Sequence, residues 1–365
     1  MKKSVITLAL VLVIALLTGC AGTPVVYYSD CTCPTGAHTE TTPADTTPVE
    51  TEPVLTTDPV AEGALKTGVA IVASAAESKS AGDADGEAKY DVTVVAVTVD
   101  DNGVIQSCVI DSIGTSVLFD VSGNIVSDLT AAVPTKNELG DNYNMKLYGG
   151  AKYEWYEQAA ELAKYAKGKT VAQLKKGAVN EAGKAADVEL AATVTIKIGG
   201  YVDAIEAAVN NAQHLGAEAG DELKLAVISS LGSSANATAE KAGTAQLDCE
   251  AVALTVKDGK ITSCAIDAVQ AKASFDATGA ITTELPANVQ TKNQLGEGYG
   301  MKAWGNAKFE WNEQAASFAK YVTGKTAAEV AGIAVAEGKP SDTDLSATVT
   351  IKIGGFQDLI AKAMQ

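Results

Sequence analysis

A long internal repeat constrains the fold of this chain more than any other feature. The second copy follows the first after about 155 residues, which is the size of a domain and several times the unit of a solenoid. Three matching blocks begin at Thr135, Glu154 and Gly168 in the first copy and at Thr291, Glu310 and Gly324 in the second. The sequence therefore predicts two tandem domains of one fold, 65–213 and 221–365, joined by a short polar link.

Each copy has the pattern of an α+β domain, in which a small and mainly antiparallel sheet packs with helices. Asn102-Gly103 and Asp258-Gly259 supply the positive φ that a tight hairpin needs, so each copy is expected to begin with a hairpin. The helix that follows has an apolar face beginning at Trp155 or Trp311. The remaining expected elements are a second hairpin at 117–126 and 273–282, a strand at 194–198 and 349–353, and a closing amphipathic helix.

The N-terminus has the pattern of a secretory signal, with Lys2 and Lys3 before an apolar run at 5–17. This run is too short for an ordinary membrane span. It ends in Leu-Thr-Gly-Cys, which resembles the lipobox of bacterial lipoproteins. The resemblance implies removal of residues 1–19, a diacylglyceryl group on Cys20, and a protein anchored by lipid at the extracytoplasmic face of the cell membrane. A plain secreted protein with a chance cysteine is the alternative.

Residues 20–64 are rich in Thr, Pro and Glu, and such a segment buries too little apolar surface to order itself. We expect a disordered stalk between the anchor and the folded part. The stalk contains Cys31 and Cys33 near His38, which leaves a metal site, a local redox pair and unpaired thiols all open.

The chain has a formal net charge of −17 and contains no arginine. Nucleic acids are bound through basic patches and forked guanidinium groups, so nucleic acid is excluded as a partner. For the same reason, a bound phosphate must be met by lysine, by backbone N–H groups or by a covalent bond.

No nucleophile and base recur together in both copies. The only histidines are His38 in the stalk and His214 near the link, so a repeated Ser-His-Asp or Cys-His site is unsupported. The residues that both copies share at matching positions are Lys136/Lys292, Tyr143/Tyr299, Met145/Met301, Trp155/Trp311, Glu157/Glu313, Gln158/Gln314, Asp187/Asp342 and Thr193/Thr348.

In both copies an Asp precedes an Ala-Thr pair that opens a β-branched run, at Asp187 to Thr193 and at Asp342 to Thr348. Taken alone, such a stretch is equally the start of a half-buried strand. Together with the lipobox, the stalk and the shared residues, it is similar to the flavinylation motif of FMN-binding domains. The whole layout resembles the peptide-pheromone-encoding lipoprotein family of extracellular electron-transfer flavoproteins.

This resemblance implies two covalent FMN groups, joined to Thr193 and Thr348 through phosphodiesters, with Asp187 and Asp342 as the acidic residues of the motif. Repetition favours a role near the flavin or its phosphate for Lys136 and Lys292, although solvated loop lysines are the simpler interpretation. The two glutamines, Gln158 and Gln314, either hydrogen-bond a flavin edge or cap local packing. We expect Trp155 and Trp311 to be core residues, because they lie on apolar helix faces.

The functional hypothesis is a membrane-anchored electron carrier rather than a substrate-specific enzyme. It would pass electrons from a membrane donor to an extracellular acceptor, after maturation by a flavin transferase. The alternative is a cofactor-free binding lipoprotein, a solute receptor or adhesin with duplicated domains. A peptide signal released from the leader is also compatible with the resemblance.

Overall fold

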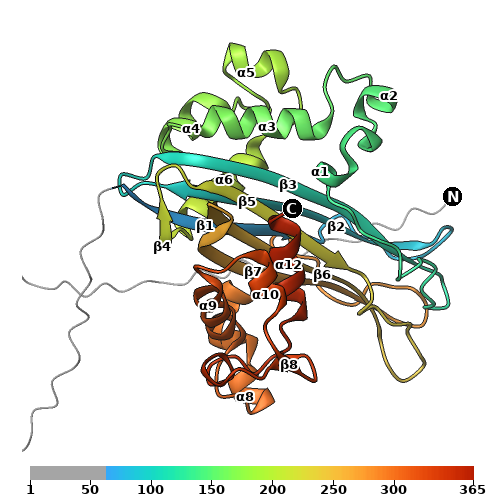
Figure 1. Ribbon diagram of the computed structural model, residues 1–365. Helices are drawn as coiled ribbons and strands as arrows, with labels where there is room; N and C mark the ends of the chain where they lie inside the picture. Colours follow the sequence, from blue (N-terminus) through green and yellow to red (C-terminus); the bar gives the residue numbers. More distant parts are fainter. Residues whose placement is uncertain (1–62) are drawn as a thin grey trace, which may run out of the picture. The chain divides into compact units, whose positions relative to one another are not determined.

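Two antiparallel β-sheets lie face to face, and each has a layer of helices on its other face (Figure 1). The computed structural model describes residues 63–365, and these fall within one compact unit. The predictions for the signal segment, Cys20, Cys31, Cys33 and His38 lie outside the described residues.

The first sheet has the strand order β3-β2-β1-β4 and the second has the order β5-β6-β7. The first hairpin predicted in each half is confirmed: β2 and β3 pair across the Asn-Gly turn, and β6 and β7 pair across the Asp-Gly turn. The strands are β1 (Ala64–Ser74), β2 (Gly86–Val99), β3 (Ile105–Phe119), β4 (Gln213–Glu218), β5 (Glu222–Ser230), β6 (Gly243–Lys257) and β7 (Lys260–Phe275).

The helices of the first half cover the first sheet, and those of the second half cover the second sheet (Figure 1). The first set comprises α1 (Lys136–Leu139), η1 (Gly140–Tyr143), α2 (Met145–Gly149), α3 (Trp155–Ala166), α4 (Val171–Ala178), α5 (Val188–Thr193) and α6 (Gly199–Asn210). The second comprises α7 (Lys292–Leu295), η2 (Gly296–Tyr299), α8 (Met301–Gly305), α9 (Trp311–Val322), α10 (Ala327–Ala331), α11 (Thr343–Ser346) and α12 (Gly354–Ala363). Between α10 and α11 lies a small hairpin of β8 (Val335–Ala336) and β9 (Lys339–Pro340).

The predicted fold class is confirmed: the chain is α+β, with antiparallel sheets packed with helices. Elements follow one another in nearly the same order in both halves. The division at 213 and 221 stays a prediction, and the predicted link contains a strand, β4, that pairs with β1.

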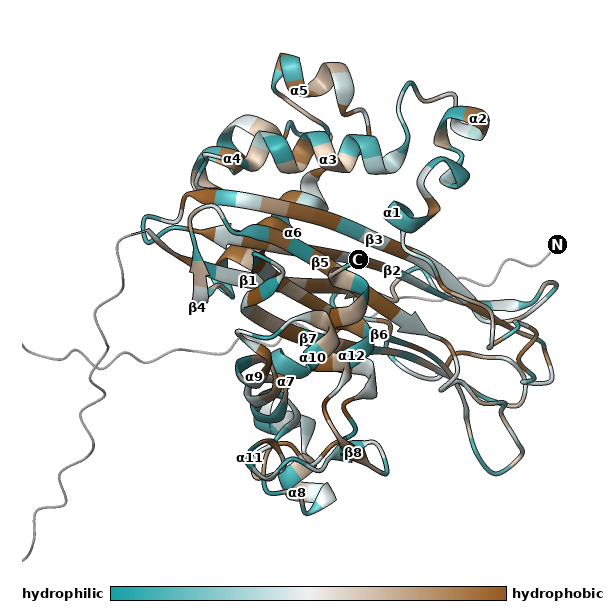
Figure 2. Cartoon of the chain, in the orientation of Figure 1, coloured by the Kyte–Doolittle hydropathy of each residue, from teal (hydrophilic) through white to brown (hydrophobic). Residues whose placement is uncertain are grey.

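The inner strands are buried on both faces, which explains their near-continuous apolar sequence. In β2, Val92 and Val94 point into the core between the sheets, whereas Val95 and Val97 point toward the helices. Figure 2 shows the hydrophobic residues running along the strands of both sheets.

The core between the sheets is built from both halves. Phe119 and Phe275 stack there with ring centroids 4.1 Å apart and an interplanar angle of 6°. Each ring lies against a glycine of the neighbouring strand: a Cβ on Gly86 would lie 2.3 Å from Phe119, and one on Gly243 would lie 2.4 Å from Phe275. Tyr90 adds a polar contact by donating from its hydroxyl to the Ala245 carbonyl at 2.8 Å.

Two predicted elements differ from the structure. The second hairpin is reduced to one bridge in each half, Phe119 to Ile125 and Phe275 to Ile281, and at each turn an Asp side chain accepts from backbone N–H groups. The predicted strand at 194–198 and 349–353 is wrong. There the backbone bonds to a glutamine side chain instead of a neighbouring strand.

Five strands were not expected from the sequence: β1, β4 and β5 in the two large sheets, and the short pair β8 and β9. In β1, Gly68 lies so close to α6 that a Cβ would approach the Ala208 carbonyl oxygen to 2.0 Å. A glycine in an apolar run is therefore a packing requirement here and not a strand breaker. No helix within residues 63–365 is both long and apolar enough to cross a bilayer.

Replacing Phe275 with Ala should lower the free energy of unfolding by about 3 to 5 kcal/mol, because it leaves a cavity between the sheets. Urea denaturation measures this change. As a control, exposed Val121→Ala should change stability by less than about 0.5 kcal/mol.

Because the central core contains both halves, Trp155 and Trp311 should report the same unfolding midpoint. Fluorescence of two variants separates the reporters. Trp155→Phe leaves only the tryptophans of the second half, and the double variant Trp304→Phe/Trp311→Phe leaves only Trp155. Two distinct transitions would contradict a shared core.

Candidate functional site

The predicted acidic residues lie at the N-termini of two short helices. Asp187 is the N-cap of α5, where its carboxylate accepts from the backbone N–H groups of Glu189 and Leu190 at 3.0 Å each. Asp342 caps α11 in the same way. An Asp at this position satisfies N–H groups that have no partner within the helix, so its first role is to fix the turn.

The two candidate threonines lie at the other ends of these turns. Thr193 is the last residue of α5 and donates from its hydroxyl to the Leu190 carbonyl at 3.2 Å. Thr348 follows α11 and donates to the Leu345 carbonyl at 3.4 Å. Both side chains are partly exposed. Each hydroxyl is therefore oriented by the hydrogen bond that it donates, and the lone pairs of its oxygen are not used in that bond.

Gln158 and Gln314 hold the segment that follows each threonine. Gln314 is fully buried on α9, and its Oε1 accepts from the N–H groups of Thr350 at 2.8 Å and Ile351 at 3.2 Å. Its Nε2 donates to the Phe309 carbonyl at 2.9 Å. Gln158 makes the same contacts in the first half. Of the two alternatives from sequence, these bonds favour packing, because both ends of the amide are occupied.

Lys136 and Lys292 begin α1 and α7, and each ammonium group lies over two aromatic rings. Lys292 Nζ is 5.1 Å from the Tyr299 ring centroid and 4.8 Å from that of Trp311. For Lys136 the distances are 5.2 Å to Tyr143 and 5.3 Å to Trp155. Such cation–π contacts fix a lysine beside an aromatic wall while leaving its N–H donors available.

A buried carboxylate anchors the start of each lysine helix. Asp267 on β7 accepts from the backbone N–H of Asn293 at 3.1 Å, and Asp111 does the same for Asn137. Burial is the largest influence on Asp267 and raises its pKa from 3.8 to about 6, although Thr291 and two backbone N–H groups oppose the rise by hydrogen bonding. The pKa of Asp111 is raised for the same reason.

The second half has a hollow of about 300 Å³ next to the segment after Thr348. Its walls consist of aromatic rings, aliphatic carbon, one carboxylate and one lysine. The lining residues are Glu250, Tyr299, Met301, Trp311, Ile351, Lys352, Gly355 and Phe356. Trp311 and Phe356 meet edge to face at 5.8 Å, which gives the hollow a rigid apolar wall.

Trp155 and Trp311 are core residues, with only 2% and 5% of their surface exposed. In the first half the Trp155 indole N–H donates to the Tyr201 hydroxyl at 3.0 Å. In the second half Phe356 takes the place of that tyrosine and offers no acceptor. The two sites are alike in backbone and unlike in polarity.

The sequence analysis did not single out two buried glutamates that hold backbone near the candidate site. Glu154 and Glu310 are buried N-caps of α3 and α9, and each also accepts from two backbone N–H groups at the start of α2 or α8. They fix the loop containing Met145 or Met301 to the long helix. Their repetition before each tryptophan was the available signal. Glu250 has no such signal, because it is absent from the first half.

The residues fit a planar aromatic group with an attached phosphate better than they fit a metal. Aromatic and aliphatic walls suit a flavin ring, and Lys292 and Lys352 supply positive charge where the chain has no arginine. Within residues 63–365 no cluster of His, Cys, Asp and Glu could hold a metal ion. Burial raises the pKa of the Cys108 and Cys264 thiols to about 12, so neither is a reactive thiolate.

Comparison with known proteins gives no match among family models, curated proteins or solved structures.

Gln314→Ala should free the segment after Thr348, because it leaves the Thr350 and Ile351 N–H groups without their acceptor. We expect a loss of about 1 to 3 kcal/mol in stability. Amide hydrogen exchange should speed up at these two residues more than in β6. Glu337→Ala, on an exposed turn of the same half, is the control. Unchanged exchange at Thr350 and Ile351 would contradict the anchoring role.

The raised pKa of Asp267 means that the folded state binds a proton more tightly than the unfolded state. Stability should therefore fall as pH rises through about 4 to 6, by roughly 3 kcal/mol for this group. Asp267→Asn should flatten that fall in urea denaturation series at several pH values. Exposed Asp258→Asn should keep the wild-type slope; an unchanged slope in Asp267→Asn would contradict the assignment.

Proposed function

We propose that this protein is a lipid-anchored electron-transfer flavoprotein of the extracytoplasmic face, with one FMN joined covalently to each of Thr193 and Thr348. The observation that supports this most is a geometry present twice. In each half, a capped turn presents a partly exposed threonine hydroxyl, and a buried glutamine fixes the chain beyond it.

The chain's own residues supply attachment and orientation. Asp187 and Asp342 fix the turns, and the Leu190 and Leu345 carbonyls orient the hydroxyls. A flavin transferase would then form the phosphodiester at the threonine oxygen. Covalent attachment suits an extracytoplasmic protein, because a freely dissociating cofactor would be lost by dilution.

When bound, FMN supplies the acceptance and release of electrons. The protein would supply apolar walls, which exclude water, and lysine charge near the phosphate or ring. Lys136 and Lys292 form no ion pair within the described residues, so their charge is not neutralised by a neighbouring carboxylate in contact. Electrons would come from a membrane donor and pass to an extracellular acceptor.

A cofactor-free binding lipoprotein is the second candidate, and one observation favours it. A cavity of about 800 Å³ lies between the two halves, lined by side chains that include His214, Asn312 and Lys320. The Asn312 Oδ1 atom is buried and has no hydrogen-bond partner within the described chain. This cavity occurs once, whereas the threonine geometry occurs in both halves.

Intact mass and in-gel flavin fluorescence of the denatured protein test the proposal. Protein co-expressed with a flavin transferase should gain two FMN-sized mass increments, and Thr193→Ala and Thr348→Ala should each remove one. Thr343→Ala, an exposed threonine on α11, is the matched control and should keep both. Absence of covalent flavin despite an active transferase would reject the proposal and favour the binding lipoprotein.

A further inference from the structure

The central strands of the two sheets have different charges at matching positions. Both strands start at a glycine packed on a phenylalanine, Gly86 in β2 and Gly243 in β6. Counted from that glycine, Lys89, Asp91 and Thr93 match Gln246, Asp248 and Glu250. The intervening residues point into the core between the sheets, so these three point toward the helix side. The formal charge of the triplet is +1 − 1 + 0 = 0 in the first half and 0 − 1 − 1 = −2 in the second.

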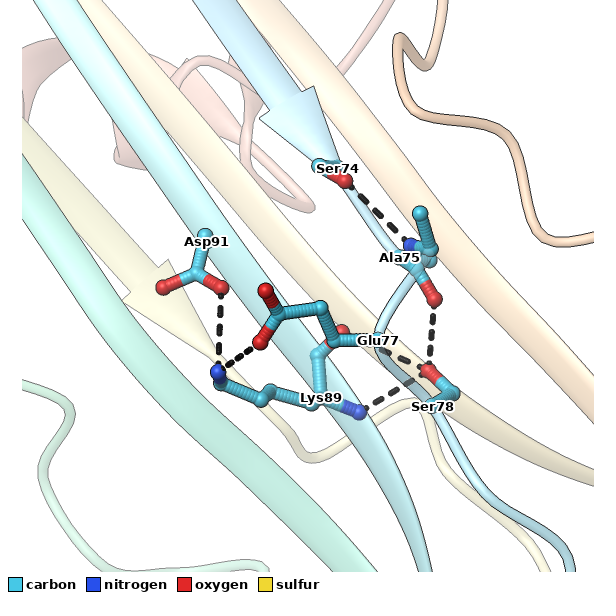
Figure 3. A network of polar contacts seen from close by, with 7 residues as sticks. Ser74, Ala75, Glu77, Ser78, Lys89 and Asp91 are labelled. Atoms are coloured by element: carbon cyan, nitrogen blue, oxygen red, sulfur yellow. Dashed lines mark hydrogen bonds and ion pairs between the residues drawn. The ribbon is translucent and has the colours of Figure 1, made fainter. Parts of the chain in front are cut away.

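In the first half the acidic residue of the triplet, Asp91, has a positively charged neighbour. Figure 3 shows Lys89 directed at Asp91 and at Glu77, with the Asp91 carboxylate 3.6 Å from the ammonium group. The Ser78 hydroxyl accepts from the Lys89 backbone N–H at 3.0 Å and fixes the turn after β1 against β2. Next along the strand, Thr93 is neutral.

In the second half the corresponding carboxylates face glutamines. Asp248 accepts from Gln246 at 2.6 Å and from Gln270 at 2.9 Å, and Gln270 in turn accepts from the Tyr299 hydroxyl at 3.3 Å. No lysine contacts Asp248 within residues 63–365. Both donors are neutral amide groups, so no positive charge is in contact with this carboxylate.

Glu250 brings a second carboxylate into the hollow itself. It lines the hollow with Tyr299, Trp311 and Phe356, and its side chain makes no hydrogen bond or ion pair within the described chain. Its Oε2 lies 2.8 Å from where a Cβ on Gly355 would be, so a larger residue at that position would require the carboxylate to shift. The charged groups around it are Asp248 on its own strand, Lys292 on α7 and Lys352 before α12.

We propose that Glu250 makes the flavin on Thr348 harder to reduce than the flavin on Thr193, and that it takes up a proton when that flavin is reduced. This inference rests on the proposed function. Electrons would therefore reside preferentially at the first site, and the reduction potential of the second site would depend more strongly on pH.

The charge balance follows from the flavin's own reduction. Conversion of oxidised FMN to its anionic reduced form consumes two electrons and one proton, and adds one negative charge. An ionised Glu250 in the same hollow opposes that charge, because Coulomb repulsion is strong in apolar surroundings. If Glu250 binds a proton from water, the second site consumes two electrons and two protons in total. Dithionite supplies the electrons in the experiment below, and the membrane donor supplies them in the proposed function.

Burial supports this role for Glu250. It raises the pKa of the carboxyl group above its usual value, and the charge of Asp248 raises it further, while Lys292 opposes both effects. A carboxyl group whose pKa is already raised binds a proton more readily when a further negative charge appears beside it.

The test uses proteins that contain one flavin each. Thr193→Ala retains the second site and Thr348→Ala retains the first, and dithionite titration with reference dyes gives the potential of each at about pH 5.5 and about pH 8. At the higher pH and a fixed solution potential, the reduced-to-oxidised ratio of the second site should be roughly tenfold lower than that of the first site. The second site should also depend more steeply on pH.

Two variants at the matching positions, one that removes the carboxylate from the second half and one that adds it to the first, separate the role of Glu250 from general structural effects. Glu250→Gln should raise the potential of the second site at the higher pH and remove its additional pH dependence. Thr93→Glu should lower the potential of the first site and add that dependence. In protein made without the transferase, a carbon-13 carboxyl titration by NMR should place Glu250 above the ordinary range for glutamate.

The outcomes distinguish this inference from the proposed function. Covalent flavin on Thr348 with a potential and pH dependence unchanged by Glu250→Gln, and with no effect of Thr93→Glu on the first site, would overturn the inference alone. Absence of flavin on Thr348, read from intact mass, would overturn both. If Glu250→Gln fails to fold, the Thr93→Glu result decides.

Discussion

The face-to-face packing of the two sheets is the interaction on which the rest of this structure depends. It requires the inner strands to be apolar on both faces, because one face meets the opposite sheet and the other meets helices. The stacked pair Phe119 and Phe275 joins the halves, and glycines on the neighbouring strands allow the close approach. The candidate threonines lie on the outer faces, where short helices and loops cover the sheets.

On those outer faces, most of the polar residues that occur in both halves form hydrogen bonds with backbone groups. The aspartates cap the threonine turns, the buried glutamines accept from the segment beyond, and Glu154 and Glu310 join two helices. The aspartates are half-buried, whereas the glutamines and glutamates are buried and hydrogen-bonded, as buried polar groups in native proteins usually are. These bonds fix the backbone on both sides of each threonine, and each threonine hydroxyl donates to a carbonyl of its own turn.

Repetition also makes the differences between the halves informative. Tyr201 and Phe356, or Thr93 and Glu250, occupy matching positions with different chemistry. A duplicated scaffold keeps the backbone geometry, since the caps and anchors are the same, while single side chains set the local polarity. The two halves therefore share a backbone framework and differ in the polarity of single side chains on it.

The sequence by itself determined the repeat, the α+β class, the glycine turns of both hairpins and the apolar faces of α3 and α9, because each follows from local periodicity or turn chemistry. It also singled out the threonines, aspartates, lysines and glutamines that the structure places in matching positions. Only the tertiary structure decided that the run after each threonine is not a strand, since a glutamine distant in sequence takes its N–H groups. Only the tertiary structure put Glu250 beside Trp311 and Phe356, because strand pairing and helix packing bring together residues that no local pattern relates.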